Sequence, residues 1–434
     1  MTHIPKLSNL LLLIVLPATA ACGPTQGPGG IALAQSDVQR VAAPAVSTGD
    51  QAELAAGNQA FALELYRYLA AQSDGNLFFS PHSISVALAM TYAGARGATE
   101  AEMARALHFT LPQDRLHPAF NGLDLALSRR GEGAEGKDGE GFRLRVVNAL
   151  WGQKDYVFLP AFLDELARNY GAGMRLVDFV ADAEAARQAI NSWVAEQTED
   201  RIKDLISPGV LDSLTRLVLT NAVYFNAAWA EPFEEGATQD GDFFLLDGTP
   251  VQVPLMQHGA RYGYARGAGY QAVELPYDGY ELSMVILLPD TGAYAAFEQG
   301  LEPAQLAAIL GALEAQQVDL TMPRFETTAK FSLVEALSAL GMPEAFSDAA
   351  DFSGMDGSKD LLIGDVIHQA FVSVDEAGTE AAAATAVIME LKMAPMEPIE
   401  PVAVRVDRPF IYLIRDLETG ALLFVGRVLN PAGS

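Results

Sequence analysis

Apolar side chains recur at helical spacing along the first half of the chain. This spacing predicts helices over residues 52–71, 83–94, 99–107 and 182–206. Thr99 stands three residues before Glu102, an arrangement typical of a helix N-terminus. We therefore expect Thr99 to cap the third of these helices.

Short apolar or alternating runs dominate the second half of the chain and predict strands. The predicted strands, including two earlier ones, span residues 144–152, 217–225, 270–275, 282–288, 318–323, 369–375, 402–406, 409–416 and 422–428. Helices early and strands late, without regular alternation, indicate an α+β protein with mostly antiparallel sheets. The glycine-rich stretch GYARGAG over residues 263–269 lacks the strand-then-helix context of a phosphate-binding loop, so it is predicted to be a surface hairpin or loop.

Residues 1–22 predict a targeting segment. Lys6 precedes an apolar run over residues 10–16, and small residues lead from there to Cys22. This order resembles a bacterial lipoprotein signal in which Cys22 becomes lipidated, although Thr19 stands where such signals usually carry Leu. The alternative is a freely secreted chain cut near Ala20. Both versions predict an extracellular or cell-envelope protein, with membrane contact only through a lipid on Cys22.

Beyond this signal the chain divides into a linker and one domain. Residues 23–52 are rich in Gly, Pro, Gln, Ser and Ala without an apolar period, which predicts a flexible linker. Dense patterning follows, so residues 53–434 are predicted to form a single domain. The run GEGAEGKDGEG at residues 131–141 predicts a surface loop inside it.

Composition and motifs exclude several classes of function. With 28 Lys+Arg against 55 Asp+Glu, the 434-residue chain carries a net charge of −27, which disfavours binding to nucleic acid or acidic lipid. One Cys cannot form an internal disulfide framework, and the six His lack metal-ligand spacing, so we expect no metal and no cofactor. No nucleophile–base motif is present, so we predict no catalytic residue and a protein that is not an enzyme.

Residues 375–393 fit two secondary structures. As a helix the segment is Ala-rich, with Glu380 early, Lys392 late and Pro395 just beyond. As a strand it would place only small side chains on one face, namely Thr379, Ala381, Ala383 and Thr385. A segment that fits both structures is suited to a conformational switch.

From Leu54 to Pro431 the chain resembles the serpin family. The resemblance rests on six collinear blocks: NLFFSPHSISVALAMTYAGARGATEAEM (76–103), WVAEQTEDRIKDLI (193–206), LTNAVYFNAAW (219–229), MPRFE (322–326), VDEAGTEAAAAT (374–385) and RPFIYLIRDLETGALLFVGRVLNP (408–431). It implies a fold of three mostly antiparallel β-sheets and eight to nine helices, with an exposed reactive loop near the C-terminus.

The resemblance also implies a mechanism. In inhibitory serpins a serine protease cleaves the reactive loop and forms an acyl-enzyme, and the loop then inserts into the central sheet and deforms the protease. This chain would accordingly be a bacterial secreted or lipoprotein-type suicide inhibitor, monomeric, with serine proteases as covalent partners. The alternative is a non-inhibitory serpin-fold binding or substrate protein.

The resemblance assigns residues to three regions around loop insertion. The hinge comprises Glu376, Gly378, Thr379, Glu380, Ala381, Ala382, Ala383, Ala384 and Thr385. The shutter, a polar cluster under the point where the central sheet opens, comprises Ser80, Ser83, Asn221 and His368. The breach, where insertion begins, comprises Trp229, Arg324 and Glu376, with an ion pair expected between the last two.

The reactive bond follows from the length of the loop. Counting 17 residues from Glu376 places the recognised side chain at Lys392 and the cleaved bond at Lys392–Met393. A lysine fits a protease pocket with an acidic floor, as in trypsin-like enzymes. Three other bonds stay open, and they would suggest chymotrypsin- or elastase-like targets: Leu391–Lys392, Met393–Ala394 and Met396–Glu397.

Overall fold

The computed structural model describes residues 25–26, 31–132, 134, 143–379 and 400–433. Cys22, the hinge positions from Glu380 to Thr385 and the Lys392–Met393 bond lie outside the described residues, as does most of the predicted loop over residues 131–141. Within the described part, the helices are all too short or too polar to cross a bilayer.

Ten α-helices are found in the described residues, slightly more than the eight to nine expected. They are α1 (Thr48–Ala71), α2 (Pro81–Tyr92), α3 (Gly97–Ala106), α4 (Gln113–Leu127), α5 (Pro160–Tyr170), α6 (Ala183–Gln197), α7 (Tyr294–Gly300), α8 (Pro303–Gly311), α9 (Val334–Ala339) and α10 (Ser353–Asp356). The four predicted helices are confirmed as α1, α2, α3 and α6. Short 3-10 turns occur at Glu235–Ala237 and Pro343–Phe346.

Two details of the helices differ from the prediction. Arg96, not Thr99, occupies the N-cap position of α3. The Thr99 hydroxyl instead donates to Glu344 at 2.9 Å and accepts from the backbone N–H of Asp351 at 2.9 Å, so it joins α3 to a distant segment. The helix predicted over 182–206 ends at Gln197, and the apolar residues beyond it are buried in a non-helical segment.

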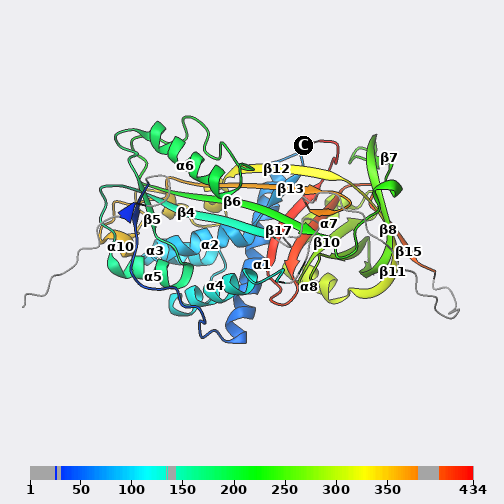
Figure 1. The fold of residues 1–434 in the computed structure, drawn as a ribbon, viewed down its shortest axis with the longest axis horizontal. Helices are drawn as coiled ribbons and strands as arrows, with labels where there is room; N and C mark the ends of the chain where they lie inside the picture. The colour runs from blue at the N-terminus through cyan, green and yellow to red at the C-terminus, as the bar shows by residue number, and fades with distance from the viewer. Residues whose placement is uncertain (1–24, 27–30, 133, 135–142, 380–399, 434) are drawn as a thin grey trace, which may run out of the picture.

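The first sheet has eight strands in the described residues and lies along one face of the molecule (Figure 1). Its order is β1 (Thr25–Gln26), β2 (Ala32–Ala34), β5 (Met174–Val177), β4 (Arg143–Gln153), β6 (Leu217–Ala228), β14 (Gly378–Thr379), β13 (Asp365–Val374) and β12 (Phe325–Ser332). The short strand β14 lies between β6 and β13 at one end, and beyond it β6 and β13 pair directly and in parallel. We call this direct β6–β13 pairing, from Asp365↔Val218 to Phe371↔Tyr224, the seam.

The second sheet has nine strands in the described residues. Its order is β15 (Val402–Arg405), β11 (Glu314–Pro323), β8 (Pro250–Gly267), β9 (Tyr270–Pro276), β10 (Leu282–Pro289), β16 (Phe410–Asp416), β17 (Leu422–Val428) and β3 (Leu77–Phe79), and β7 (Gln239–Phe244) pairs with β8. Because β8 is 18 residues long and pairs with β7, β9 and β11, two of the three expected sheets are joined into one hydrogen-bonded network. The glycine-rich stretch over residues 263–269 forms the β8–β9 hairpin, as predicted.

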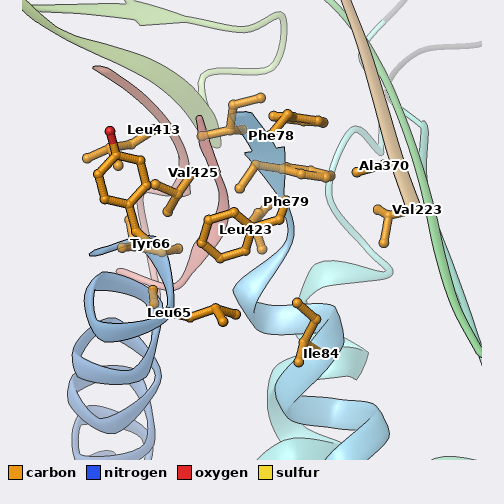
Figure 2. Close-up of a cluster of buried hydrophobic side chains, with 14 of the residues drawn as sticks. Leu65, Tyr66, Phe78, Phe79, Ile84, Val223, Ala370, Leu413, Leu423 and Val425 are labelled. Atoms are coloured by element: carbon orange, nitrogen blue, oxygen red, sulfur yellow. The ribbon is translucent and has the colours of Figure 1, made fainter. Parts of the chain in front are cut away.

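The largest core cluster packs the first sheet against the second sheet and helices α1 and α2. Figure 2 shows side chains of α1 and β3, including Tyr66 and Phe79, beside Ile84 of α2, with Val223 and Ala370 contributed by β6 and β13. Val223 and Ala370 are paired across the seam, so the core packs against both β6 and β13. A strand inserted at the seam would have to separate these two strands.

A flexible linker was expected over residues 23–52, but much of the later part of this segment is bound to the rest of the fold. Strand β2 pairs with the edge strand β5, and the first turn of α1 already begins at Thr48. Ser47 caps α1 by accepting a hydrogen bond from the Asp50 N–H. We call residues 31–46 the N-terminal strap, because they lie against β5, α5 and α4.

Candidate functional site

The seam is the parallel junction in the middle of an otherwise largely antiparallel region of the first sheet. Seven residue pairs connect β6 and β13, from Asp365↔Val218 to Phe371↔Tyr224. Strand β14 is antiparallel to both neighbours. Extending β14 along the seam would therefore replace one parallel pairing with two antiparallel ones, which are the more stable pairing per residue.

The four shutter residues predicted from the sequence meet in one hydrogen-bond network beneath the seam. Ser80 caps α2, and its hydroxyl accepts from the Ser83 N–H at 3.2 Å. Asn221 of β6 lies opposite His368 of β13 in the register of the seam, and its side-chain N–H donates to the Ser83 hydroxyl. The network thus joins both strands of the seam to the N-terminus of α2.

The contacts of His368 fix its tautomer. Its Nε2 accepts from the backbone N–H of Ser80 at 3.2 Å, so the proton resides on Nδ1 and is donated to the Asn221 side-chain oxygen. Complete burial lowers the pKa of His368 from 6.5 to about 3, which keeps the ring neutral and preserves this pattern. Opening the seam at this level would break the bond between His368 and Asn221.

Asn148 of β4 is a fifth member of this network, and the sequence reasoning missed it. Its side-chain oxygen accepts from Asn221 and from the Ser83 hydroxyl, the latter at 3.1 Å. Its N–H donates to the Ser83 carbonyl at 3.2 Å. The available signal was a single amide within the apolar run of residues 146–151, which a buried strand tolerates only where the amide finds partners.

The hinge begins with a tight turn that sends the chain back into the first sheet. The Asp375 side chain accepts from the N–H groups of Ala377 at 2.8 Å and Gly378 at 3.2 Å. Gly378 has φ +153°, and a Cβ at this position would lie 2.2 Å from the Ala227 carbonyl oxygen. Only glycine fits this approach of the turn to β6.

Thr379 lies fully buried between β6 and β13. It pairs with Ala227 on one side and Val374 on the other, and its hydroxyl meets the Tyr277 hydroxyl at 2.9 Å. Thr379 is the first position of the small-residue face predicted from the sequence. In this structure it already occupies the position between the strands.

Glu376 and Arg324 form the ion pair that the breach assignment predicted. The Arg324 Nε donates to a Glu376 carboxylate oxygen at 2.7 Å, and the Thr238 hydroxyl donates to the same oxygen. Burial raises the pKa of the Glu376 carboxyl, but these hydrogen bonds outweigh burial and hold its pKa below the ordinary value. Glu376 is 3% exposed, so loss of Arg324 would leave a buried carboxylate with one donor fewer.

Trp229 anchors the same turn from the side of β6. Its backbone N–H donates to the Ala377 carbonyl at 3.0 Å, and its indole N–H donates to the Asp375 carbonyl at 3.0 Å. The indole stacks on Tyr277 with ring centroids 4.7 Å apart and nearly parallel planes. The three breach residues therefore surround the point where β14 enters the sheet. Within the described residues, no three metal-ligating side chains gather closely enough to hold an ion.

The comparisons with known proteins agree with this architecture. The family described as Serpin (serine protease inhibitor) matches residues 56–431. An uncharacterized serpin-like protein of Thermococcus kodakarensis is 42% identical over 372 residues, which cover 86% of this chain and 84% of that protein. The leukocyte elastase inhibitor of Sus scrofa is 41% identical over 389 residues, covering 87% of this chain and all of that protein.

Solved structures show the same likeness. Human thyroxine-binding globulin, crystallised in complex with thyroxine, superimposes with a TM-score of 0.77 at 30% identity, covering 88% of this chain and 99% of that one. Serpin48 of Tenebrio molitor, described as a highly specific serpin, gives a TM-score of 0.76 at 30% identity, covering 87% and 98% of the two chains.

Proposed function

The chain belongs to the serpin family of serine protease inhibitors, and we propose that it is an extracytoplasmic suicide inhibitor of trypsin-like serine proteases. The observation that carries this proposal is strand β14, whose Gly378 and Thr379 already lie between β6 and β13. After cleavage, the loop could therefore enter the sheet by extending β14 between these two strands. The next residues on the same face, Ala381, Ala383 and Thr385, are all small, so they would meet little steric resistance.

The driving force for insertion follows from the seam. A strand of roughly a dozen residues adds a dozen or more ladder hydrogen bonds, each contributing about 0.5–1.5 kcal/mol net. That sum is comparable to the whole folding stability of an ordinary domain, about 5–15 kcal/mol. The uncleaved state is therefore expected to be metastable with respect to insertion.

The proposed chemistry is the first half of proteolysis. The protease serine oxygen attacks the carbonyl carbon of Lys392 and forms an ester, and the Lys392–Met393 bond breaks. The amine of Met393 leaves with the proton delivered by the protease histidine. Insertion then carries the ester-linked protease away before water can hydrolyse the ester, so the protease stays covalently bound.

Incubation with trypsin followed by denaturing electrophoresis tests this function. We expect a covalent band that contains trypsin joined to the chain up to Lys392, together with a released peptide that begins at Met393 and ends at Ser434 by mass spectrometry. A peptide that begins at Lys392, Ala394 or Glu397 would move the reactive bond and with it the class of target protease.

Lys392→Ala is the matched control for target class. An acidic protease pocket without its cation keeps an unpaired buried charge, so the rate with trypsin should fall by several orders of magnitude. The rate with an elastase-like enzyme should rise or barely change, since a shallow pocket accepts Ala. The leukocyte elastase inhibitors among the relatives make elastase the natural second protease in this assay.

The alternative is a non-inhibitory binding or substrate protein with the same fold. The likeness to thyroxine-binding globulin, which was crystallised in complex with thyroxine, is the observation that favours this alternative. Clean cleavage by trypsin and by elastase, without a covalent band, would favour it.

We further propose that the chain is a bacterial secreted or lipoprotein-type member of the family, anchored through a lipid on Cys22 and monomeric. This part of the proposal rests on residues 1–22, whose charged, apolar and small-residue segments end at Cys22. Metabolic labelling with palmitate tests the anchor, because Cys22→Ser should abolish the label and release the protein from the envelope. Size-exclusion chromatography with light scattering tests the monomer.

A further inference from the structure

The N-terminal strap is bound to the edge of the first sheet. Residues Ala32–Ala34 pair with Leu176, Arg175 and Met174 of β5. The strap then crosses so close to Gly173 that a Cβ there would lie 2.8 Å from the Ala34 carbonyl oxygen. Ser36 follows with a hydrogen bond from its hydroxyl to Asp164 of α5. The first half of the strap is therefore attached to β5 and α5.

The second half of the strap is attached to α4 and α5 together. The Val41 N–H donates to the Arg168 carbonyl of α5 at 3.0 Å, while the Val41 carbonyl accepts from the buried Asn121 side chain of α4 at 2.8 Å. Arg40 donates to the Asn121 oxygen at 2.8 Å and forms an ion pair with Asp124, also in α4. A single residue, Val41, thus bridges two helices through its own backbone.

Helices α4 and α5 contact each other, but their further connections lead to opposite sides of the seam. Helix α5 leads almost directly into β5, which is connected through β4 to β6 on one side of the seam. Helix α4 is joined to α1 by the Arg115–Asp50 ion pair, and α1 packs on β17 of the second sheet. Strands β12 and β13, on the other side of the seam, contact β3 of that same sheet.

Widening of the first sheet at the seam would then shift α5 relative to α4. A new strand widens the first sheet by about 4.8 Å, the spacing between neighbouring strands. Strands β6, β4 and β5 would shift against the body that holds β13, the second sheet, α1 and α4. A shift of even 1–2 Å between α4 and α5 would break hydrogen bonds of about 2.8–3.0 Å at Val41 and Arg40.

We propose that the N-terminal strap is a built-in restraint on sheet opening, which slows spontaneous insertion of the uncleaved loop. This inference rests on the proposed function, because it concerns the rate of the same insertion. The hydrogen bonds and the ion pair of Val41 and Arg40 can form only while α4 and α5 keep their present positions. The strap therefore stabilises the uninserted state and not the inserted one.

Arg40→Ala in the full chain tests the restraint, with Arg168→Ala as the matched control. Arg168 contributes only its backbone carbonyl to the strap, and its half-exposed side chain pairs with Glu165. Each uncleaved protein is held at a moderately raised temperature, and samples are tested for trypsin trapping and for the thermal midpoint. Arg40→Ala should lose trapping about tenfold faster or more, with a rise in thermal midpoint that marks insertion, whereas the control should follow the wild type.

The combined variant Arg40→Asp with Asp124→Arg provides the rescue. It restores an ion pair between the strap and α4, so it should convert more slowly than Arg40→Asp alone. Conversion of Arg40→Ala at the wild-type rate, or loss of trapping through unfolding without a rise in midpoint, would overturn the restraint. Those outcomes leave the proposed function intact, since it fails only if fresh wild-type protein does not trap a protease.

Discussion

Thr379→Arg is expected to convert the protein from an inhibitor of trypsin into a substrate. Thr379 is fully buried between β6 and β13, and its hydroxyl meets Tyr277 at 2.9 Å. The backbone beside it is equally confined, because Gly378 leaves no room for a Cβ against Ala227. An arginine at position 379 would place a guanidinium in this closed space, or would force the hinge out from between the strands.

The size of the effect follows from the burial. A charged group left buried without a partner costs about 3–5 kcal/mol, so the arginine should drive the hinge of the uncleaved variant out from between β6 and β13. Insertion must then bring residue 379 back into the sheet at that cost. Since about 1.4 kcal/mol corresponds to a tenfold change in rate, insertion should slow by roughly two to four orders of magnitude. Trapping requires insertion to outrun hydrolysis of the acyl-enzyme, so trypsin should be released active.

The assay measures the stoichiometry of inhibition together with the covalent band on denaturing electrophoresis. Mass spectrometry should show that trypsin still cuts the variant at the wild-type bond. Glu380→Arg is the matched control, because in an inserted strand the alternation of side chains would place residue 380 on the opposite face from Thr379. Wild-type stoichiometry for Thr379→Arg, or an equal loss for Glu380→Arg, would refute the assignment of Thr379 as the first inward residue.

Three further predictions concern stability and the hinge. Cleavage within residues 386–396 should raise the thermal midpoint, because the freed loop completes the sheet; an unchanged midpoint in calorimetry would contradict insertion. Burial lowers the pKa of His368 to about 3 and the pKa values of His82 and His117 to about 4. Below pH 6.5 these histidines therefore bind protons in the unfolded chain but not in the folded protein. Stability is then full above pH 6.5 and should fall by about 2 kcal/mol per histidine by pH 5, and a denaturant midpoint that is constant from pH 7 to 5 would exclude this. Gly378→Ala should displace β14 and reduce trapping while leaving cleavage intact, and unimpaired trapping would show that the turn is not needed.

Local pattern was sufficient for nine of the strands and four of the helices in the described residues, although it missed the longest strand, β8. Alternating or continuous apolar runs predicted β10, β16 and β17 nearly to the residue, because these strands are buried and their side chains must be apolar whatever their neighbours are. The elements that were not predicted include the edge strand β2, the strand β8 and the helices α4 and α5. Their sequences are more mixed, and their positions depend on what they pack against.

The site shows the same division. The sequence motifs identified Gly378, Thr379 and the four shutter residues, yet the role of Asn148 depends on which strand lies beside Asn221. His368 and Asn221 are 147 positions apart, and only the parallel pairing of β6 with β13 brings them into contact.

The N-terminal strap is the clearest case of a feature that only the tertiary structure decided. The sequence predicted a flexible linker over residues 23–52, because the segment has no sustained apolar period. Whether such a segment stays flexible depends on partners elsewhere in the chain, here the open edge of β5 and the polar side chains of Asn121 and Asp124. The sequence by itself determined the most buried strands, such as β10, β16 and β17, the glycine of the hinge and the family. The fold decided where the strap binds, because backbone hydrogen bonds and ion pairs between distant segments leave no periodic trace in either segment.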